Sequence, residues 1–363
     1  MTNLASHLMS ERLRNQRLTR TTFRTATDVV AWLGAVQSQD YPGAKWGLGQ
    51  RTIGLTDALV ERAFNEGAIL RTHVLRPTWH FVSPDDLRWL MTLSGPRVSA
   101  RCATYYRNLE LDAGLLTRSR KVFERTLEGG NQLTRLELQN ALARAKVAVT
   151  GVRLAFVVMC AELDSVICSG ARRGKQFTYA LFDERVPARK PLTRDEAVAA
   201  LTARFFTSHG PATIKDFVWW SGLTVKDARD GIAMVTPALA KQEVGDRTYW
   251  FVPSKTSTPP ASRTGFLLPN YDEYLVAYKD RDTGVSAVVA RRMVEGQFDS
   301  YAHPLVVDGK LAGTWRRVVT ARSARVIVLP FGRLNRASTR ALDGATARLA
   351  KFLEMPAEWR RGG

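Results

Sequence analysis

A pattern of helix, turn, helix and short strand pair recurs along this chain of 363 residues and limits the folds that it can adopt. The clearest copy begins at Thr134, a predicted helix cap with Glu137 three residues on, as in a capping box. A second helix is expected over residues 153–164, and a β-hairpin with a basic, glycine-flanked turn over residues 166–181. Two helices followed by a hairpin indicate a winged helix.

Two further copies flank this one. In the later copy, helices are expected at residues 195–208, 213–220 and 224–235, with a wing strand at 247–252. The last of these helices is the candidate recognition helix of a helix-turn-helix. The earlier, looser copy has one helix that begins at Thr27 and ends before Pro42. Its second helix begins at Thr56, and a strand region covers residues 69–82.

The composition changes after a linker-like run at residues 255–260. Strands are expected at residues 265–268, 274–278, 301–307, 311–319 and 325–329, with Asp308-Gly309 as a hairpin turn, and a closing helix at 337–353. The predicted class is α+β: three tandem winged helices, a C-terminal antiparallel β-domain and a closing helix. The corresponding domains are residues 1–115, 116–190, 191–254 and 255–363.

Charge indicates the partner. The chain has 53 Lys and Arg residues against 34 Asp and Glu residues, a formal net charge of +19. Such an excess is typical of proteins that bind a polyanion, most often nucleic acid. The alternative is a merely basic globular protein, because 41 of the 53 positive residues are arginine, a bias that GC-rich coding also favours.

The remaining composition argues against several other classes. The three cysteines favour a reducing cytoplasm over a disulfide framework, and the Cys and His residues lack zinc-ligand spacing, so we expect no metal. The N-terminus lacks the apolar core of a signal peptide, and the most apolar stretch, residues 154–163, is too short to span a bilayer. We expect a cytoplasmic, nucleoid-associated protein without a membrane segment.

The tripeptide Gln37-Ser38-Gln39 closes the first apolar helix of this prediction. Two neutral amides cannot exchange protons as an acid or base, but their oxygens and N–H groups can hold a water molecule. On a helix, residues i and i+2 lie about 200° apart. The two glutamines therefore converge only if the helix loosens there, which Pro42 favours. The alternative is two ordinary solvent-facing amides at a helix end.

Four segments of the chain are informative as a set. They are residues 33–40 (LGAVQSQD), 75–81 (LRPTWHF), 268–275 (LPNYDEYL) and 307–315 (VDGKLAGTW). Together they resemble the AlkZ-like (YcaQ-type) winged-helix DNA glycosylases, in the branch with a Gln-X-Gln motif, over residues 5–355. The resemblance implies tandem winged helices with a β-domain around a concave basic surface for duplex DNA. It also implies excision of alkylated purines, in some members with unhooking of crosslinks, with Gln37 and Gln39 at the reaction centre.

One residue departs from the family pattern. The middle position is usually aliphatic, and here it is Ser38. A sister branch has Gln-X-Asp, but Asp40 is one position too far along to match that carboxylate.

Neutral amides suit one kind of substrate. A purine alkylated at N7 or N3 is cationic and already a good leaving group, and its glycosidic bond breaks through an oxocarbenium-like state. Positioning a water and stabilising the sugar cation with dipoles then suffice, without protonation of the base. A site made of two glutamines is therefore expected to act only on activated lesions.

The candidate DNA contacts lie mainly in strands, hairpins and the predicted recognition helix. Trp219-Trp220 could offer a stacking platform, but helical spacing favours core packing. The acidic residues 272–273 are assigned a structural role, because carboxylates near DNA usually hold arginines. The predicted contacts are Arg71, His73, Arg76, Thr78, His80, Arg172, Arg173, Lys175, Lys226, Arg229, Trp315, Arg316 and Arg317; for His73 and His80 an ordinary hydrogen-bonded strand histidine stays an equal alternative.

Two functions follow. The first is a monofunctional DNA glycosylase without cofactor or metal, which acts as a monomer on alkylated duplex DNA. The second is a non-catalytic winged-helix DNA-binding protein, for example a transcriptional regulator, which would discriminate strongly among sequences and would often dimerise. The sequence has no heptad repeat, which favours the glycosylase.

Overall fold

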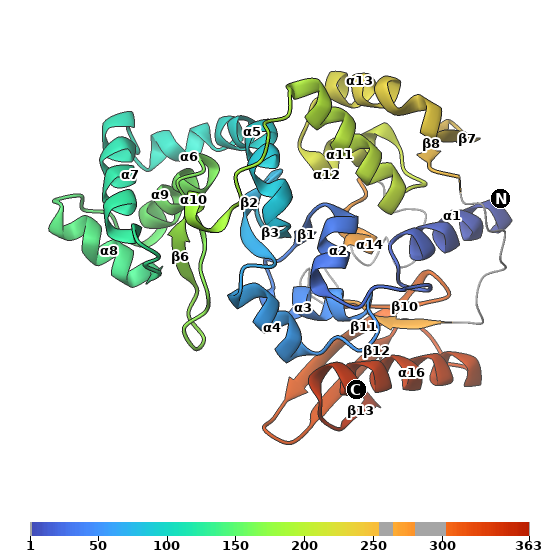
Figure 1. Cartoon of the computed structure of the whole chain (residues 1–363). Coiled ribbons are helices and arrows are strands. Elements are labelled where there is room, and N and C mark those ends of the chain that lie inside the picture. Colours follow the sequence, from blue (N-terminus) through green and yellow to red (C-terminus); the bar gives the residue numbers. More distant parts are fainter. Residues whose placement is uncertain (1, 254–263, 280–302, 363) are drawn as a thin grey trace.

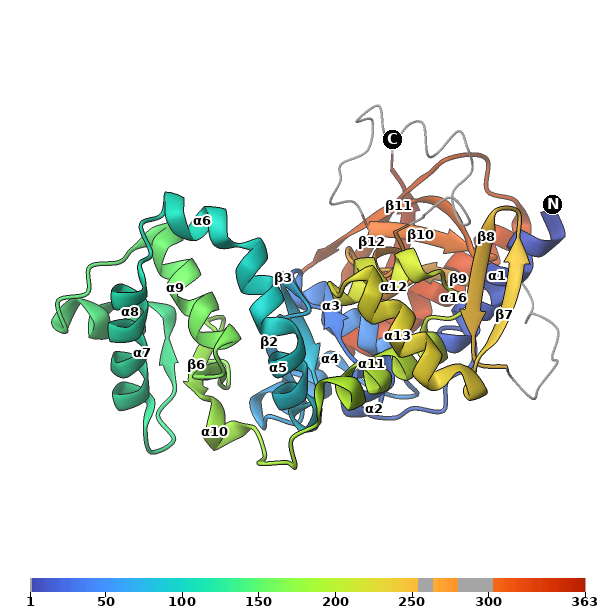
Figure 2. The ribbon, with the colours of Figure 1, turned by 90° about the horizontal axis from the view of Figure 1, so that it is seen from above.

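The computed structural model describes residues 2–253, 264–279 and 303–362. Within these ranges the chain combines helices with four small sheets and is of the α+β class, as predicted. The predicted linker at residues 255–260 and the start of the predicted strand at 301–307 lie outside the described residues. In Figures 1 and 2, helices α7 to α9 lie at one end of the molecule and the C-terminal sheet lies well apart from them.

One order of elements recurs three times. It runs helix, short strand, helix, helix and two-stranded hairpin, and we call each copy a unit. The first unit comprises α2 (Ala26–Leu33), β1 (Val36–Gln37), α3 (Tyr41–Gly49), α4 (Asp57–Asn65), β2 (Leu70–Val74) and β3 (Arg76–Val82), with sheet order β1-β3-β2.

The second unit repeats the arrangement with the same strand order. It comprises α7 (Ala113–Leu127), β4 (Leu133–Thr134), α8 (Arg135–Arg144), α9 (Gly151–Leu163), β5 (Ile167–Ser169) and β6 (Thr178–Leu181), in sheet order β4-β6-β5. The capping box at Thr134 and Glu137 forms as predicted. The predicted domain boundary at residues 115–116 falls inside α7.

In the third unit an isolated bridge at Ala212 replaces the first strand. Its elements are α11 (Arg194–Ser208), α12 (Ile214–Ser221), α13 (Val225–Val235), β7 (Ala240–Val244) and β8 (Arg247–Phe251). Helices, turn and wing lie where the sequence predicts them. The recurrence supports three winged helices, while the division into domains stays a prediction.

The C-terminal part forms a five-stranded sheet of order β13-β12-β11-β10-β9. Asp308 and Gly309 make the predicted turn between β10 and β11. The sheet is antiparallel except at one edge, where β13 pairs parallel with β12, which corrects the all-antiparallel expectation. The elements are β9 (Gly265–Leu267), α14 (Glu273–Val276), β10 (His303–Val307), β11 (Lys310–Val319), β12 (Ala324–Pro330), α16 (Arg336–Leu353) and β13 (Ala357–Arg361).

The prediction of a strand at residues 274–278 is wrong. This segment begins with the short helix α14, because the Asp272 side chain caps it by accepting the Tyr274 N–H at 2.9 Å. Helices α5 (Pro84–Arg101), α6 (Ala103–Asn108) and α10 (Phe182–Arg185) connect the units. Helix α1 (Thr2–Asn15) precedes the first unit, and the 3-10 turn η1 (Thr236–Ala238) lies between α13 and β7.

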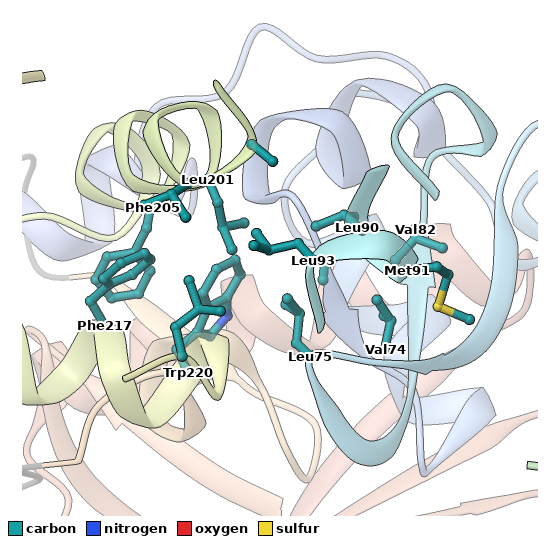
Figure 3. Close-up of a cluster of buried hydrophobic side chains, with 14 of the residues drawn as sticks. Val74, Leu75, Val82, Leu90, Met91, Leu93, Leu201, Phe205, Phe217 and Trp220 are labelled. Atoms are coloured by element: carbon teal, nitrogen blue, oxygen red, sulfur yellow. The ribbon is translucent and has the colours of Figure 1, made fainter. Parts of the chain in front are cut away.

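Three of the hydrophobic cores position the units. One core joins the β2–β3 hairpin and α5 to the third unit, with Val74 and Leu75 close to Leu201, Phe205 and Trp220 (Figure 3). A second core joins the first unit to the C-terminal sheet and α16. The second unit has a core of its own, while Cys168 of β5 belongs to the first core and Met159 and Leu163 of α9 pack with Val98 of α5. The first unit is therefore held from both sides, and most of the second unit packs in a separate core.

Candidate active site and DNA interface

The Gln-Ser-Gln tripeptide begins in strand β1 and continues into a bend at Gln39, which corrects the prediction that it ends a helix. Helix α2 begins after the cap Thr25, not at Thr27, and ends at Leu33 because Gly34 takes φ +83°, a backbone conformation that side chains disfavour. The chain then enters β1, where Gln37 lies opposite His80 of β3. The side-chain oxygens of Gln37 and Gln39 accept hydrogen bonds from Arg76 and Trp79 of β3. The two amides therefore approach the same strand without a loosened helix.

Gln37 is fixed at both its backbone and its side chain. It is 9% exposed, and its N–H donates to Glu273 Oε1 at 2.9 Å. Its side-chain oxygen accepts a hydrogen bond from Arg76 Nη2 at 3.2 Å. A guanidinium offers donors alone, so this contact selects the amide oxygen over the amide nitrogen.

Gln39 follows the end of β1 and is exposed. Its side-chain oxygen accepts the Trp79 N–H at 3.4 Å, so both amides of the motif are directed to β3. Ser38 lies between them on the other side of the strand and is fully buried. Its Oγ has no hydrogen-bond partner among the described residues, while its carbonyl accepts Arg71 Nε at 3.1 Å.

His80 is a neutral histidine beneath the motif. It is fully buried, its Nδ1 donates to the Thr78 carbonyl at 2.8 Å, and its Nε2 lies 3.3 Å from Arg76 Nη2. Burial and the adjacent Arg76 charge lower the pKa of His80 to about 3. An uncharged ring of this tautomer accepts from Arg76, which thereby bridges His80 and Gln37.

Two carboxylates at the start of α14 support the site, its cap Asp272 and its first residue Glu273. Asp272 binds Arg51 through both oxygens, at 2.7 and 2.8 Å, in the buried interior. Glu273 is 1% exposed and accepts from Gln37 and, at 3.0 Å, from Trp220 Nε1. Burial by itself raises the pKa of Glu273, but its interaction with His209 and the charge of Arg76 outweigh this and hold the pKa at about 2.

The four informative segments of the sequence meet at this place. Residues 36–37 pair with β3, and Glu273 contacts Gln37. Trp315 Nε1 donates to the Leu268 carbonyl at 2.8 Å, and the Tyr274 hydroxyl donates to the Gly309 carbonyl at 2.8 Å. The segments are therefore parts of one structural assembly.

Four of the predicted DNA contacts are buried and a fifth, Arg76, is partly buried, and all five make contacts inside the protein. Arg71 lies over the rings of Trp79 and Phe177, and His73 contacts Glu162 through Nδ1. Arg76 and His80 hold Gln37, as described above, and Trp315 is 3% exposed. The chemical reason is common to them: each polar group satisfies a carbonyl, a carboxylate or an aromatic face of the interior.

Other predicted contacts reach the surface to different degrees. Arg173, Lys175, Lys226, Arg229 and Arg316 are exposed. Arg173 pairs with Glu137 at 2.7 Å and Lys226 with Asp230 at 2.6 Å. Half-buried side chains are those of Thr78, Arg172 and Arg317. Arg172 Nη1 lies 3.2 Å from Glu61 Oε1, which fixes the β5–β6 hairpin against α4.

Among the tryptophans of α12, Trp220 is core and Trp219 is partly exposed. The Trp219 indole N–H donates to the Val276 carbonyl at 2.9 Å, and Lys279 Nζ lies 4.6 Å from its ring centre. Core packing is thus confirmed for Trp220.

Sequence reasoning missed the contact from Glu273 to the motif and the bridging position of Arg76. A signal was present: adjacent acids in an apolar, aromatic segment are expected to be buried with partners. In the ranges that the structure describes, no group of three or more His, Cys, Asp or Glu side chains is arranged to hold a metal, and no helix is long and apolar enough to cross a bilayer.

Helix-turn-helix units with hairpin wings, on a strongly basic chain, define a protein of the winged-helix DNA-binding class. Within that class the sequence model of the AlkZ-like DNA glycosylases matches residues 30–352. The chain belongs to this family. A curated relative, the interstrand DNA cross-link repair glycosylase of Streptomyces sahachiroi, is 26% identical over 360 residues, which cover 94% of each chain.

The fold comparison agrees. The solved structure of the Streptomyces sahachiroi DNA glycosylase AlkZ superposes with a TM-score of 0.80 at 22% sequence identity. The match covers 98% of this chain and 99% of that one. At this identity the likeness concerns the fold.

Proposed function

We propose that this DNA glycosylase hydrolyses the N-glycosidic bond of cationic N7- or N3-alkylated purines in duplex DNA, with a water oriented by Gln37 and Gln39. The proposal depends on one observation: the side chains of both glutamines point to β3, and each side-chain oxygen accepts one hydrogen bond from that strand. A carbonyl oxygen has two lone pairs, so each amide keeps one acceptor site and its N–H donors for water or substrate.

The groups around the motif favour an activated substrate. His80 is neutral with its ring nitrogens engaged, and Glu273 is ionised and accepts two hydrogen bonds, so neither is disposed to protonate a leaving base. A lesion that already has a positive charge needs no such proton. The oxocarbenium-like state would be stabilised by amide dipoles and by the buried negative charge of Glu273.

The monofunctional reaction is supported by the state of the lysine nearest in sequence to the motif. A glycosylase with lyase activity needs a free amine as nucleophile. Lys45 of α3 is buried and pairs with Asp57 at 2.7 Å and Glu61 at 2.8 Å. Its amine is thus a structural cation, and water is the proposed nucleophile.

Duplex DNA is the proposed partner, bound by a monomer through exposed basic side chains such as Lys175 and Arg316. The name of the Streptomyces relative extends the proposal to crosslinked purines. The buried Arg71, Arg76 and His80 are proposed to order the site beneath the DNA. The cytoplasmic, nucleoid-associated location stays a prediction.

The alternative, a sequence-specific regulator, relied on α13 as a recognition helix. Lys226 of α13 pairs with Asp230, and Asp227 pairs with Arg194 at 2.7 Å, so the charges of this helix are largely balanced. This argues against α13 as the reader of a base sequence.

The decisive experiment uses a duplex that contains 7-methylguanine. The wild-type protein is expected to generate abasic sites, and the double variant Gln37→Ala, Gln39→Ala is expected to lose this activity while retaining affinity for the duplex. A bulky N7 adduct and an interstrand crosslink test the range of substrates. Excision at the wild-type rate by the double variant would refute the mechanism, and a footprint on one operator sequence would favour the regulator.

A further inference from the structure

Strand β1 lies at the edge of its sheet, so one side of its backbone has no neighbouring strand. The Ser38 N–H donates inward to the Trp79 carbonyl at 2.7 Å, and the Gln37 N–H points to the opposite side. A buried N–H without a partner costs free energy comparable to a lost hydrogen bond. The first glutamine therefore needs an acceptor that its own sheet does not supply.

Glu273 is that acceptor, and it comes from a segment 236 residues later in the chain. Its first oxygen accepts from Gln37, and its second accepts from Trp220 Nε1 at 3.0 Å and lies 3.4 Å from His209 Nε2. Hydrogen bonds to an ionised acceptor are stronger than those between neutral groups. The Gln37 backbone is thus held by a carboxylate whose own position is fixed by two rings.

The same charge helps to fix the side chain. The negative Glu273 and the positive Arg76 attract each other in a buried setting. Arg76 in turn donates to the Gln37 side-chain oxygen at 3.2 Å. Glu273 thus holds the Gln37 backbone and Arg76 holds the Gln37 side-chain amide, and the two charges balance each other.

The third unit supplies the rings, and its design is unlike that of a DNA reader. Residues 191–254 contain seven Lys and Arg and seven Asp and Glu, in a chain of net charge +19. The turn of its helix-turn-helix is packed against the rest of the protein. A Cβ added to Gly222 would lie 2.3 Å from the Leu75 carbonyl oxygen, and Arg97 Nε donates to the Gly222 carbonyl at 2.9 Å. Trp220 packs in the core behind this turn (Figure 3).

We propose that Glu273 is a positioning residue for Gln37, and that the third winged-helix unit serves as the scaffold of this contact and not as a DNA reader. The inference rests on the proposed role of Gln37. In this proposal Trp220 and His209 of the third unit support catalysis indirectly, because they hold Glu273 in place. The side chains that bind phosphates lie in other parts of the chain.

The test compares Glu273→Gln with the wild type on a duplex that contains 7-methylguanine. Glutamine keeps the size of the side chain, but its NH2 group must face one of the donors that the carboxylate accepts. We expect the single-turnover excision rate to fall about 10- to 100-fold, because small displacements of a reacting group are costly. The dissociation constant for a duplex with an abasic-site analogue should change less than about twofold, because DNA affinity is dominated by phosphate contacts elsewhere.

Controls separate positioning from folding. Glu243→Gln, an exposed position on β7, makes the same charge change outside the network and should leave rate and affinity unchanged. Trp220→Phe keeps the packed ring, removes one donor, and should lower the rate less than Glu273→Gln does. If Glu273→Gln fails to fold, the excision rates and duplex affinities of Trp220→Phe and Glu273→Asp are compared with those of the wild type instead.

A readout without catalysis makes the two proposals separable. The Gln37 amide proton should resonate far downfield in the wild type, shift upfield in Glu273→Gln, and exchange faster with solvent. If the wild type excises nothing while this shift occurs, the proposed function fails and the contact stands. An unchanged Gln37 resonance, a wild-type excision rate in folded Glu273→Gln, or an equal loss of rate and affinity would each overturn the inference.

Discussion

At the scale of single residues, the site consists of neutral groups held by buried charges. Gln37 and His80 share one guanidinium nitrogen, that of Arg76. In the proposed mechanism this arrangement separates two tasks: the charged residues order the site, and the uncharged glutamines face the substrate. It explains why so many residues around the motif are buried in a protein whose partner is a polyanion.

The buried histidine makes stability depend on pH. The folded pKa of His80 is about 3, below the unfolded value of about 6.5, so the folded state binds fewer protons between these values. The stabilising contribution is complete above pH 6.5 and is lost as the pH falls toward 3. We expect the free energy of unfolding to fall by about 1.4 kcal/mol per pH unit for this residue. Urea titrations from pH 6.5 to 5 measure the slope.

The control for this slope is His80→Gln, which removes the titrating ring. Its unfolding free energy should depend less on pH over the same interval, by about the same 1.4 kcal/mol per unit. The remaining slope belongs to groups such as His209, whose pKa burial also lowers. Equal slopes in variant and wild type would contradict the neutral assignment of His80.

At the scale of elements, we expect the hairpin β5–β6 to contact DNA phosphates and the helix α13 not to contact them. Lys175 at the hairpin is exposed, whereas Lys226 on α13 is bound to Asp230. Lys175→Ala should therefore make the logarithmic salt dependence of duplex affinity shallower by about 0.9, the contribution of one phosphate contact. Lys226→Ala should leave the slope unchanged. Affinity measured over a range of salt concentrations distinguishes these outcomes, and a large effect of Lys226→Ala would return α13 to the DNA interface.

Local signals explain which elements were predictable. The caps Thr56, Thr134 and Thr224 lie beside the residues that they bind, so their helices follow from short sequence windows. Strand β1 has two residues, and its partner His80 lies far along the chain, so periodicity could not reveal it. Helix α14 has the aromatic composition of a strand, and only the Asp272 cap distinguishes it.

The geometry of the candidate site was the hardest part to predict. Gln37 and Gln39 stay the predicted site residues on a family resemblance, and their helical placement was wrong. Glu273 and Arg51 were beyond reach, because each finds its partner through tertiary folding across more than two hundred residues.

At the scale of the whole molecule, the cores divide the chain unevenly. The first unit shares cores with the third unit and with the C-terminal sheet, whereas most of the second unit packs in a core of its own. Phe123 of α7 is fully buried in that separate core. We expect Phe123→Ala to destabilise the second unit by about 3–5 kcal/mol. Hydrogen exchange should accelerate in α7 to α9 and stay unchanged in β1 to β3. Equal acceleration in both regions would mean that the chain unfolds as one body.

The left-handed turn at Gly34 has a consequence for how this protein tolerates length changes. Only two residues separate Gly34 from Gln37, which pairs with His80 in the two-residue strand β1. An insertion or deletion of one residue between Gly34 and Gln37 would place another side chain opposite His80 and turn the Gln37 amide to the other face of the sheet. Gene variants with such a frame-preserving change should make a folded product without repair activity, whereas loops elsewhere on the surface should accept added residues.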